Sequence, residues 1–221
     1  MNASHFLLVL LLCLLCALPG NAQSRSSVSG EGQQTRMLTS PALQLTMKIV
    51  GQIYCRGDSD LDGLRLNVLF SYSNTGSQPL LLYKGSNLAS RIMVSRTLED
   101  AAAKRFELNS SVTHVTASGS KCFKGSVPTK CFVILPPGRS YDVKGIVGVF
   151  AFRDDSRPVQ GGIVSGNHIL EVEVPTWPAS NELARKLSGL WEQRMDLWSR
   201  PITTEPIAFT VEKQRRIAAC H

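Results

Sequence analysis

The sequence predicts a mostly β protein: an antiparallel β-sandwich with one amphipathic α-helix inserted before the last strand. Three observations lead to this fold class. Roughly eight short segments alternate apolar and polar residues with a period of two, as half-buried strands do. Turns rich in Gly, Pro and Asn separate these segments. One segment near the C-terminus changes to the spacing of a helix.

An uncharged apolar run at residues 6–18 predicts a secretory signal peptide over residues 1–22. The run is shorter than the roughly 20 apolar residues that a membrane span needs, and Pro19 follows it. Gly20 and Ala22 are small enough for a signal peptidase site, so we expect cleavage after Ala22. No later run is long enough to cross a bilayer. We therefore expect a mature chain without a transmembrane segment, secreted or located in the periplasm.

The ordered part of the chain is expected to begin near residue 42. Residues 23–41 are rich in Ser, Gln and Gly without an apolar period, which predicts a flexible leader. Residues 42–221 should then form a single domain. Its first strand is predicted at 43–49, and a clearer one follows at 64–72. After a turn, a short apolar strand is predicted at 80–83.

The middle of the chain leaves alternatives open. A short strand is predicted at 91–95, and residues 98–104 fit one or two helical turns. Residues 109–120 are rich in Ser and Thr and fit either a strand or a loop. A strand at 131–135 should end at the Pro-Pro-Gly that follows. Residues 141–152 predict one or two further strands.

The C-terminal part combines two strands with the predicted helix. Residues 169–174 alternate as a strand does. Apolar residues then recur at helical spacing over about 181–198, with Ser180 as the expected N-cap. Residues 207–211 predict the closing strand. The helix is expected to pack on the sandwich through its large apolar residues, which are Leu183, Leu187, Leu190, Trp191 and Trp198.

Two turn segments resemble those of bacterial immunoglobulin-like domains of exported proteins. They are Asn-Thr-Gly-Ser-Gln-Pro-Leu at 74–80 and Leu-Pro-Pro-Gly-Arg-Ser-Tyr at 135–141. In such domains a Pro-Gly turn leads into a late strand. The resemblance spans about residues 42–211 and implies that the predicted antiparallel β-sandwich is immunoglobulin-like. It names no specific family and carries over no functional residue, and the predicted helix departs from a plain sandwich.

Four cysteines remain after removal of the signal peptide: Cys55, Cys122, Cys131 and Cys220. An even number in an exported chain favours disulfide bonds, and four cysteines allow three pairings. Cys122 and Cys131 flank a segment containing the turn formers Gly125 and Pro128, so the two can meet across a hairpin. We therefore favour Cys122–Cys131 and, by elimination, Cys55–Cys220. No Cys-x-x-Cys pair supports a zinc site.

An acidic turn is the sharpest candidate for a metal site. Asp58, Asp60 and Asp62 place carboxylates at alternate positions, and Gly63 permits a sharp turn, as in the first half of a calcium-binding loop. The acid expected at the twelfth position is replaced by Leu69, so a calcium ion would need a further ligand. The alternative is a solvated acidic turn. We expect no other cofactor.

Charge and motifs favour a binding or structural protein over an enzyme. The chain has 24 Lys and Arg against 17 Asp and Glu, a net charge of +7. Such a protein could bind another protein or an anionic envelope or polysaccharide surface. Without an aromatic and basic stripe, we expect no nucleic acid partner. No Gly-x-Ser-x-Gly or His-Glu-x-x-His motif is present, and the Ser-x-x-Lys at 118–121 lies in a Ser-rich segment without its companion motifs. The alternatives are a calcium-stabilised adhesion module using the acidic turn and a secreted hydrolase with an unrecognised site; oligomeric state is left open.

Overall fold

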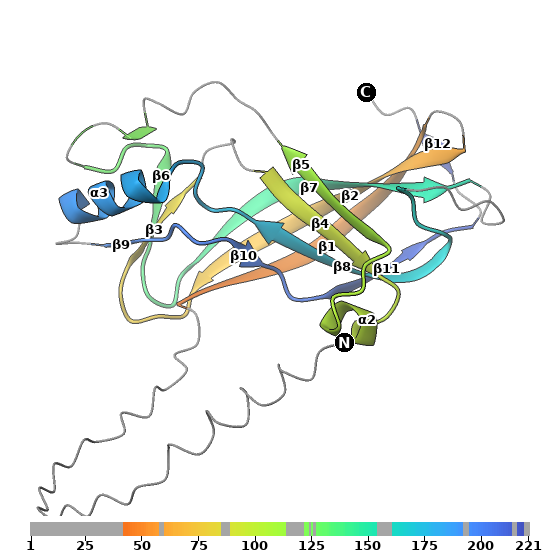
Figure 1. Cartoon of the computed structure of the whole chain (residues 1–221), viewed down its shortest axis with the longest axis horizontal. Coiled ribbons are helices and arrows are strands. Elements are labelled where there is room, and N and C mark those ends of the chain that lie inside the picture. The colour runs from red at the N-terminus through yellow and green to blue at the C-terminus, as the bar shows by residue number, and fades with distance from the viewer. Residues whose placement is uncertain are drawn as a thin grey trace, which may run out of the picture. The chain divides into compact units, whose positions relative to one another are not determined.

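The chain folds into β-sheets of mixed and antiparallel type with two helices among the described residues (Figure 1). The computed structural model describes residues 42–57, 60–84, 89–113, 122–123, 125, 127–153, 161–191, 195–213 and 216–218. The predicted signal peptide and the leader lie outside these residues. The expected mostly β fold is confirmed.

A four-stranded sheet contains the longest strands and has the order β12-β1-β2-β7. Its strands β1 (Leu43–Arg56), β2 (Leu61–Asn74) and β7 (Ser140–Phe152) pair antiparallel. The short β12 (Ile217–Ala218) pairs with β1 in parallel. This parallel edge corrects the expectation of purely antiparallel sheets.

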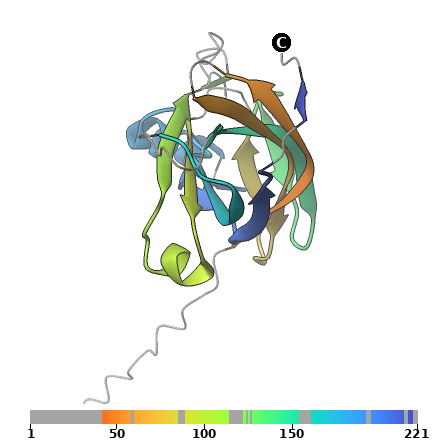
Figure 2. The same ribbon diagram turned by 90° about the vertical axis from the view of Figure 1, so that its right-hand side faces the viewer.

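A five-stranded antiparallel sheet lies opposite the first (Figure 2). Its order is β10-β8-β4-β5. The strand β11 also pairs with β8, along an earlier stretch of β8 than the one that pairs with β10. Its strands are β4 (Ala89–Ser95), β5 (Leu108–Thr113), β8 (Gly166–Val174), β10 (Ile202–Thr203) and β11 (Ile207–Val211).

The main hydrophobic core fills the space between these two sheets. Every second residue of β2 points into it, which explains the period of two in the sequence. The same core receives side chains from β4, β8 and β11 of the opposite sheet. Its buried members include Leu64, Leu66, Val68, Ile92, Val94, Val147, Val149, Leu170, Val172 and Phe209.

A β-bulge in β1 changes which residues of that strand face the core. The pairing register shifts between Ile49, opposite Val68, and Gly51, opposite Asn67, so Val50 is an extra residue. Before the bulge the odd-numbered residues point inward, and after it the even-numbered ones do. Tyr54 is consequently buried.

A third sheet has three strands, and its central strand is buried on both faces. Its order is β6-β3-β9, with β6 (Phe132–Leu135), β3 (Leu80–Tyr83) and β9 (Asp196–Leu197). All four residues of β3 are buried. Leu80 and Leu82 pack with Leu43 and Trp198, whereas the alternate residues of β3 pack beneath a helix.

That helix, α3 (Asn181–Trp191), lies beside β3 and β6 at one end of this unit (Figure 1). Ser180 caps it as predicted: the amide of Leu183 donates to Ser180 Oγ at 3.2 Å. The other helix, α2 (Leu98–Ala102), is the single turn that the sequence left open, and Thr97 caps it.

The predicted length of the late helix is wrong. The sequence indicated residues 181–198, but α3 ends at Trp191, and β9 already occupies Asp196–Leu197. The change is explained by the edge of β3 that does not pair with β6, because the buried backbone groups along that edge need hydrogen-bond partners. The amide of Asp196 donates to Pro79 O at 3.0 Å, and the amide of Trp198 donates to Leu81 O at 3.0 Å.

The packing predicted for this segment is correct only in part. Leu187 and Trp191 lie in the cluster beneath α3, and Leu183 packs against it. Trp198 is buried in a different cluster, and Leu190 is exposed. Leu190 was expected inside because it fits the helical period. The side of α3 that packs against β3 covers Leu187 and Trp191 and does not extend around the helix as far as Leu190.

Most of the remaining strands match their predictions. Residues 141–152 belong to one strand, β7, and residues 109–113 belong to β5. The predicted closing strand at 207–211 is β11, but it is not the last, since β12 follows it. The two-residue strands β9, β10 and β12 were not predicted, because two residues carry no readable period.

Candidate binding surface

The acidic turn holds an ion pair. Asp62 is buried, on the inward face of β2, and its Oδ1 accepts from Arg153 Nη2 at 3.0 Å. The amide of Arg153 also donates to the carbonyl of Asp60 at 2.8 Å. The side chain of Asp60 is exposed, and Asp58 lies outside the described residues. Within the described segments, no group of three or more His, Cys, Asp or Glu side chains is placed to hold a metal ion.

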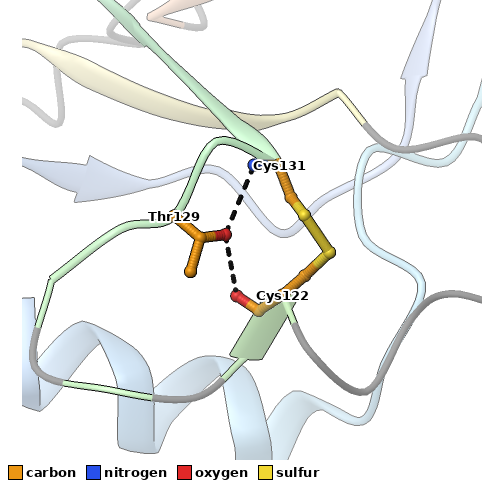
Figure 3. The surroundings of a disulfide bond; sticks show 3 residues. All are labelled: Cys122, Thr129 and Cys131. Atoms are coloured by element: carbon orange, nitrogen blue, oxygen red, sulfur yellow. Dashed lines mark hydrogen bonds between the residues drawn. A yellow bond between two sulfur atoms is a disulfide. The ribbon is translucent and has the colours of Figure 1, made fainter.

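The predicted disulfide bond between Cys122 and Cys131 is present, with an S–S distance of 2.05 Å (Figure 3). Thr129 holds the two ends of the loop together. Its hydroxyl donates to Cys122 O, and the amide of Cys131 donates to the same hydroxyl oxygen, both at 3.3 Å. The bond therefore fixes the segment that enters β6.

Cys55 is also disulfide-bonded. Its predicted partner, Cys220, lies outside the described residues, so the Cys55–Cys220 pairing stays a prediction. The register of β12 is compatible with it, because Ala218 lies directly beside Cys55 in the parallel pair.

A cluster of aromatic rings lies beneath α3, next to the disulfide. Phe132 is central to it: its ring centroid is 5.3 Å from that of Trp191 and 6.4 Å from that of Trp177. Both tryptophans are buried. These rings form the core that attaches α3 to the three-stranded sheet, and they present no open face to a ligand.

A buried histidine at the end of the sandwich was not predicted as part of any site. His168 is 0% exposed, and its Nε2 lies 2.8 Å from Val164 O and 3.2 Å from Arg96 Nη1. Its Nδ1 lies 2.9 Å from Glu107 Oε2. Arg96 and Glu107 are distant from His168 in the sequence, so no local spacing of residues predicts this cluster. A fully buried imidazole cannot touch a substrate in this conformation.

A small pocket is lined by three tyrosines, Tyr72, Tyr83 and Tyr141, with Lys84 at its side. Its volume of about 110 Å³ is below that of pockets for drug-sized ligands. Burial raises the pKa of Tyr72 to about 12, and the neighbouring Tyr141 adds to the shift. The phenol therefore stays neutral over the physiological range.

The outward face of the four-stranded sheet carries an unusual set of exposed apolar side chains. Val50 is 59% exposed, Ile146 is 55% exposed and Phe150 is 54% exposed, and Ile53 accompanies them at 39%. We call the outward side of these three strands the β1–β2–β7 face. Large apolar side chains gathered on one surface mark a site of interaction more often than isolated ones do.

The strand register arranges this face in six rows that cross β1, β2 and β7. Each row holds three residues that are direct neighbours across the sheet. In chain order along β1, the first two rows are Gln44–Ser73–Ser140 and Thr46–Ser71–Asp142, which are polar. The four rows that carry the apolar and basic residues are Lys48–Leu69–Lys144, Gly51–Asn67–Ile146, Ile53–Arg65–Gly148 and Cys55–Gly63–Phe150.

Basic side chains lie among the apolar ones. Lys48 and Lys144 are exposed at the two ends of one row, and Arg65 lies between Ile53 and Gly148 in another. A groove lined by Ile53 also contains Arg216 and Glu212. The acid on the face itself is Asp142, whose Oδ1 accepts from Ser71 Oγ at 2.6 Å. The face is therefore basic as well as apolar.

Glycines keep this face low between its large side chains. Gly51, Gly63 and Gly148 occupy one position in each of three adjacent rows. A methyl group added at Gly148 would meet no atom within 4 Å, so nothing in the packing requires a glycine there. The result is a broad surface on which Ile146 and Phe150 project. The sequence signal for it was the pair of apolar residues on the outward positions of β7.

Comparisons with known proteins do not assign the chain to a group. No protein-family model matches it, and no curated protein matches it significantly. Two solved structures show a weak likeness. One is a structural-genomics target, with 9% identity, a TM-score of 0.33 and coverage of 81% of this chain and 92% of the other. The second is described as the "Putative ApaA Protein from Bordetella pertussis", with 10% identity, a TM-score of 0.32 and coverage of 78% of this chain and 97% of the other.

No helix in the described part of the chain is long and apolar enough to cross a membrane.

Proposed function

We propose that this chain is an exported, non-enzymatic binding protein that attaches to a partner in the envelope or extracellular space through its β1–β2–β7 face. The observation that carries the proposal is the concentration of exposed apolar side chains on that face. Val50, Ile53, Ile146 and Phe150 all belong to it. Keeping such side chains in water is unfavourable, and a partner that covers them gains the hydrophobic free energy.

Two features support export. The apolar run at residues 6–18, ending at Pro19, has the length of a signal-peptide core. The Cys122–Cys131 bond and the disulfide at Cys55 are of the kind that persists in oxidising compartments. We infer that cleavage after Ala22 releases the mature protein into the periplasm or the medium.

The immunoglobulin-like form of the sandwich is part of the proposal. It is supported by two sheets that share one core and by the contact between the two turns that carry the resemblance. Asn74 Nδ2 donates to Gln78 O in its own turn and to Leu135 O at the start of the other, both at 2.8 Å. The amide of Gly138 also donates to Asn74 O at 2.8 Å.

A non-enzymatic role fits the way the conspicuous polar groups are used. Asp62 is paired with Arg153, and His168 is wholly buried among Glu107, Arg96 and a carbonyl. Both serve packing. The face that remains open offers apolar and basic side chains, which suit attachment.

The test is attachment of the mature protein to a washed envelope fraction of the source cells. A double variant, Ile146→Ser with Phe150→Ser, should lose most of the bound fraction. The matched control, Leu98→Ser with Leu190→Ser, removes two equally exposed apolar residues elsewhere and should keep it. Circular dichroism confirms that both variants fold. Equal binding by wild type and both variants would overturn the proposal.

A further inference from the structure

We propose that the partner of the β1–β2–β7 face is the surface of an anionic lipid bilayer. This inference rests on the proposed function and names the chemistry of the occupant. A bilayer interface offers negative phosphates beside hydrocarbon, and the face offers Lys and Arg beside Ile and Phe. The two surfaces are complementary in charge and in polarity.

The rows of the face set the two kinds of side chain at neighbouring positions. Lys48 and Lys144 bracket Leu69 in one of these rows. The next row places Ile146 one strand away from Asn67, and the last ends at Phe150. Lysine stems can lie along apolar neighbours while their ammonium groups reach outward to phosphates. Ile146, one row away from the lysines, and Phe150, three rows away, would then enter the headgroup boundary.

Glycines leave space beside the large side chains of the face. Gly51 and Gly148 lie at the ends of two rows and Gly63 lies at the centre of a third, and the groove at the edge of the face is lined by Ile53, Arg216 and Glu212. The projecting side chains of Ile146 and Phe150 can therefore enter a bilayer interface. A polyanion without hydrocarbon, such as an acidic polysaccharide, would satisfy the basic side chains and leave the apolar ones in water.

Charge also argues against a second copy of this chain as the occupant. The face carries Lys48, Arg65 and Lys144 against Asp142, which already accepts a hydrogen bond from Ser71. Two such faces brought together would oppose positive charge to positive charge. An anionic bilayer removes that repulsion and attracts each basic residue.

The experiment is co-sedimentation of the full mature protein with vesicles of equal parts phosphatidylglycerol and phosphatidylcholine, compared with pure phosphatidylcholine. We expect binding to the mixed vesicles and little to the neutral ones. Lys48→Gln with Lys144→Gln should weaken binding about 25-fold, about fivefold for each lysine. Phe150→Ser should weaken it about tenfold or more, because a buried phenylalanine is lost from the interface.

The matched control is Lys84→Gln with Lys130→Gln, which changes the net charge equally at two exposed lysines away from the face. It should reduce binding less than threefold. Equal losses for the two lysine pairs would mean non-directional attraction and would overturn the lipid inference. Sedimentation velocity completes the test: a dimer that Phe150→Ser dissociates would identify a second copy as the occupant instead.

The two proposals can fail separately. If envelope binding depends on Ile146 and Phe150 but the vesicles do not bind, and protease treatment of the envelope abolishes binding, the partner is a protein. The attachment function then stands and the lipid inference falls. If neither envelope nor vesicles bind, both are wrong.

Discussion

Asn74 connects several segments of the molecule through hydrogen bonds that no sequence motif predicted. Its side chain is buried and donates to Gln78 O and Leu135 O, while its Oδ1 accepts from the amide of Gly76 at 2.9 Å. Its backbone bonds to Gly138 and Arg139 in the second turn. One residue therefore fixes the end of β2, the start of β3 and the turn between β6 and β7.

Replacing Asn74 by Ala should lower the free energy of unfolding by about 2–4 kcal/mol, because one buried carbonyl, one part-buried carbonyl and a part-buried amide lose their partner. Asn167→Ala is the matched control. Its oxygen accepts one exposed bond from Thr210, and its loss should cost under about 1 kcal/mol. Urea denaturation of the two variants measures the difference, and similar values for both would contradict this role for Asn74.

Tyr72 predicts a specific loss of stability in alkali. Its pKa is raised to about 12 in the folded state by burial, against about 10 in the unfolded chain. The folded state thus holds the phenolic proton more tightly. The stabilisation is complete below pH 10 and is lost as the pH rises from 10 to 12, by up to about 2 kcal/mol.

The measurement for Tyr72 is urea denaturation of wild type and Tyr72→Phe at pH 9 and near pH 12. Phenylalanine cannot ionise, so the wild type should lose stability relative to the variant across this interval. A constant difference between the two proteins would show that Tyr72 ionises as readily in the folded state as in the unfolded chain.

At this scale the sequence predicted some pairings and could not predict others. Cys122–Cys131 was accessible because the two residues are close along the chain and flank turn formers. Asp62 was interpreted as a metal ligand because its neighbours in sequence are acidic, yet its partner Arg153 is 91 positions away. His168 is likewise explained by Glu107 and Arg96, which only the folded sheet brings near.

At the scale of elements, α3 is held by one narrow side. Leu187 is 2% exposed in the cluster with Trp177 and Trp191, whereas Leu190, three positions on, is 54% exposed. The two leucines lie on one helix and differ in burial, so they separate packing from helix propensity.

Leu187→Ala should therefore destabilise the protein by about 2–5 kcal/mol, from lost apolar burial and a cavity beneath α3. Leu190→Ala should change stability by under about 0.5 kcal/mol. Thermal or urea unfolding of both variants measures this. A larger loss of stability for Leu190→Ala than for Leu187→Ala would contradict the packing of α3 described here.

Periodicity succeeded for long elements and failed at their ends. It placed β1, β2, β7 and β11, where alternate residues face one core. It extended the late helix to residue 198, because Leu197 and Trp198 continue the helical spacing. Strand pairing along β3 takes those residues instead, and that competition is settled by tertiary structure.

At the scale of the molecule, two hydrophobic clusters on opposite sides of β3 join the sandwich to α3. Tyr72 and Ile202 pack against one of them and also against the main core. The two-sheet arrangement was predictable from strand number and turns. The three-stranded sheet was not, since β9 supplies one of its edges and has no sequence signature.

Disulfide mapping tests the connection between the chain's ends. Peptide mass spectrometry without reduction, on protein recovered from its source cells and their medium, should show Cys122 linked to Cys131 and Cys55 linked to Cys220. The same spectrum should give Gln23 as the first residue. A peptide linking Cys220 to any other cysteine would exclude the second pairing, and an N-terminus before Gln23 would move the cleavage site.

The bulge at Val50 gives β1 one residue more than its partner requires. Removing Val50 would leave Ile49 opposite Val68 and Gly51 opposite Asn67, so every other pair would keep its place and its side. A residue added to either half of the strand would shift the register of that half by one position, so that its inward side chains would point outward. The fold of this chain should therefore tolerate shortening at this position more readily than lengthening.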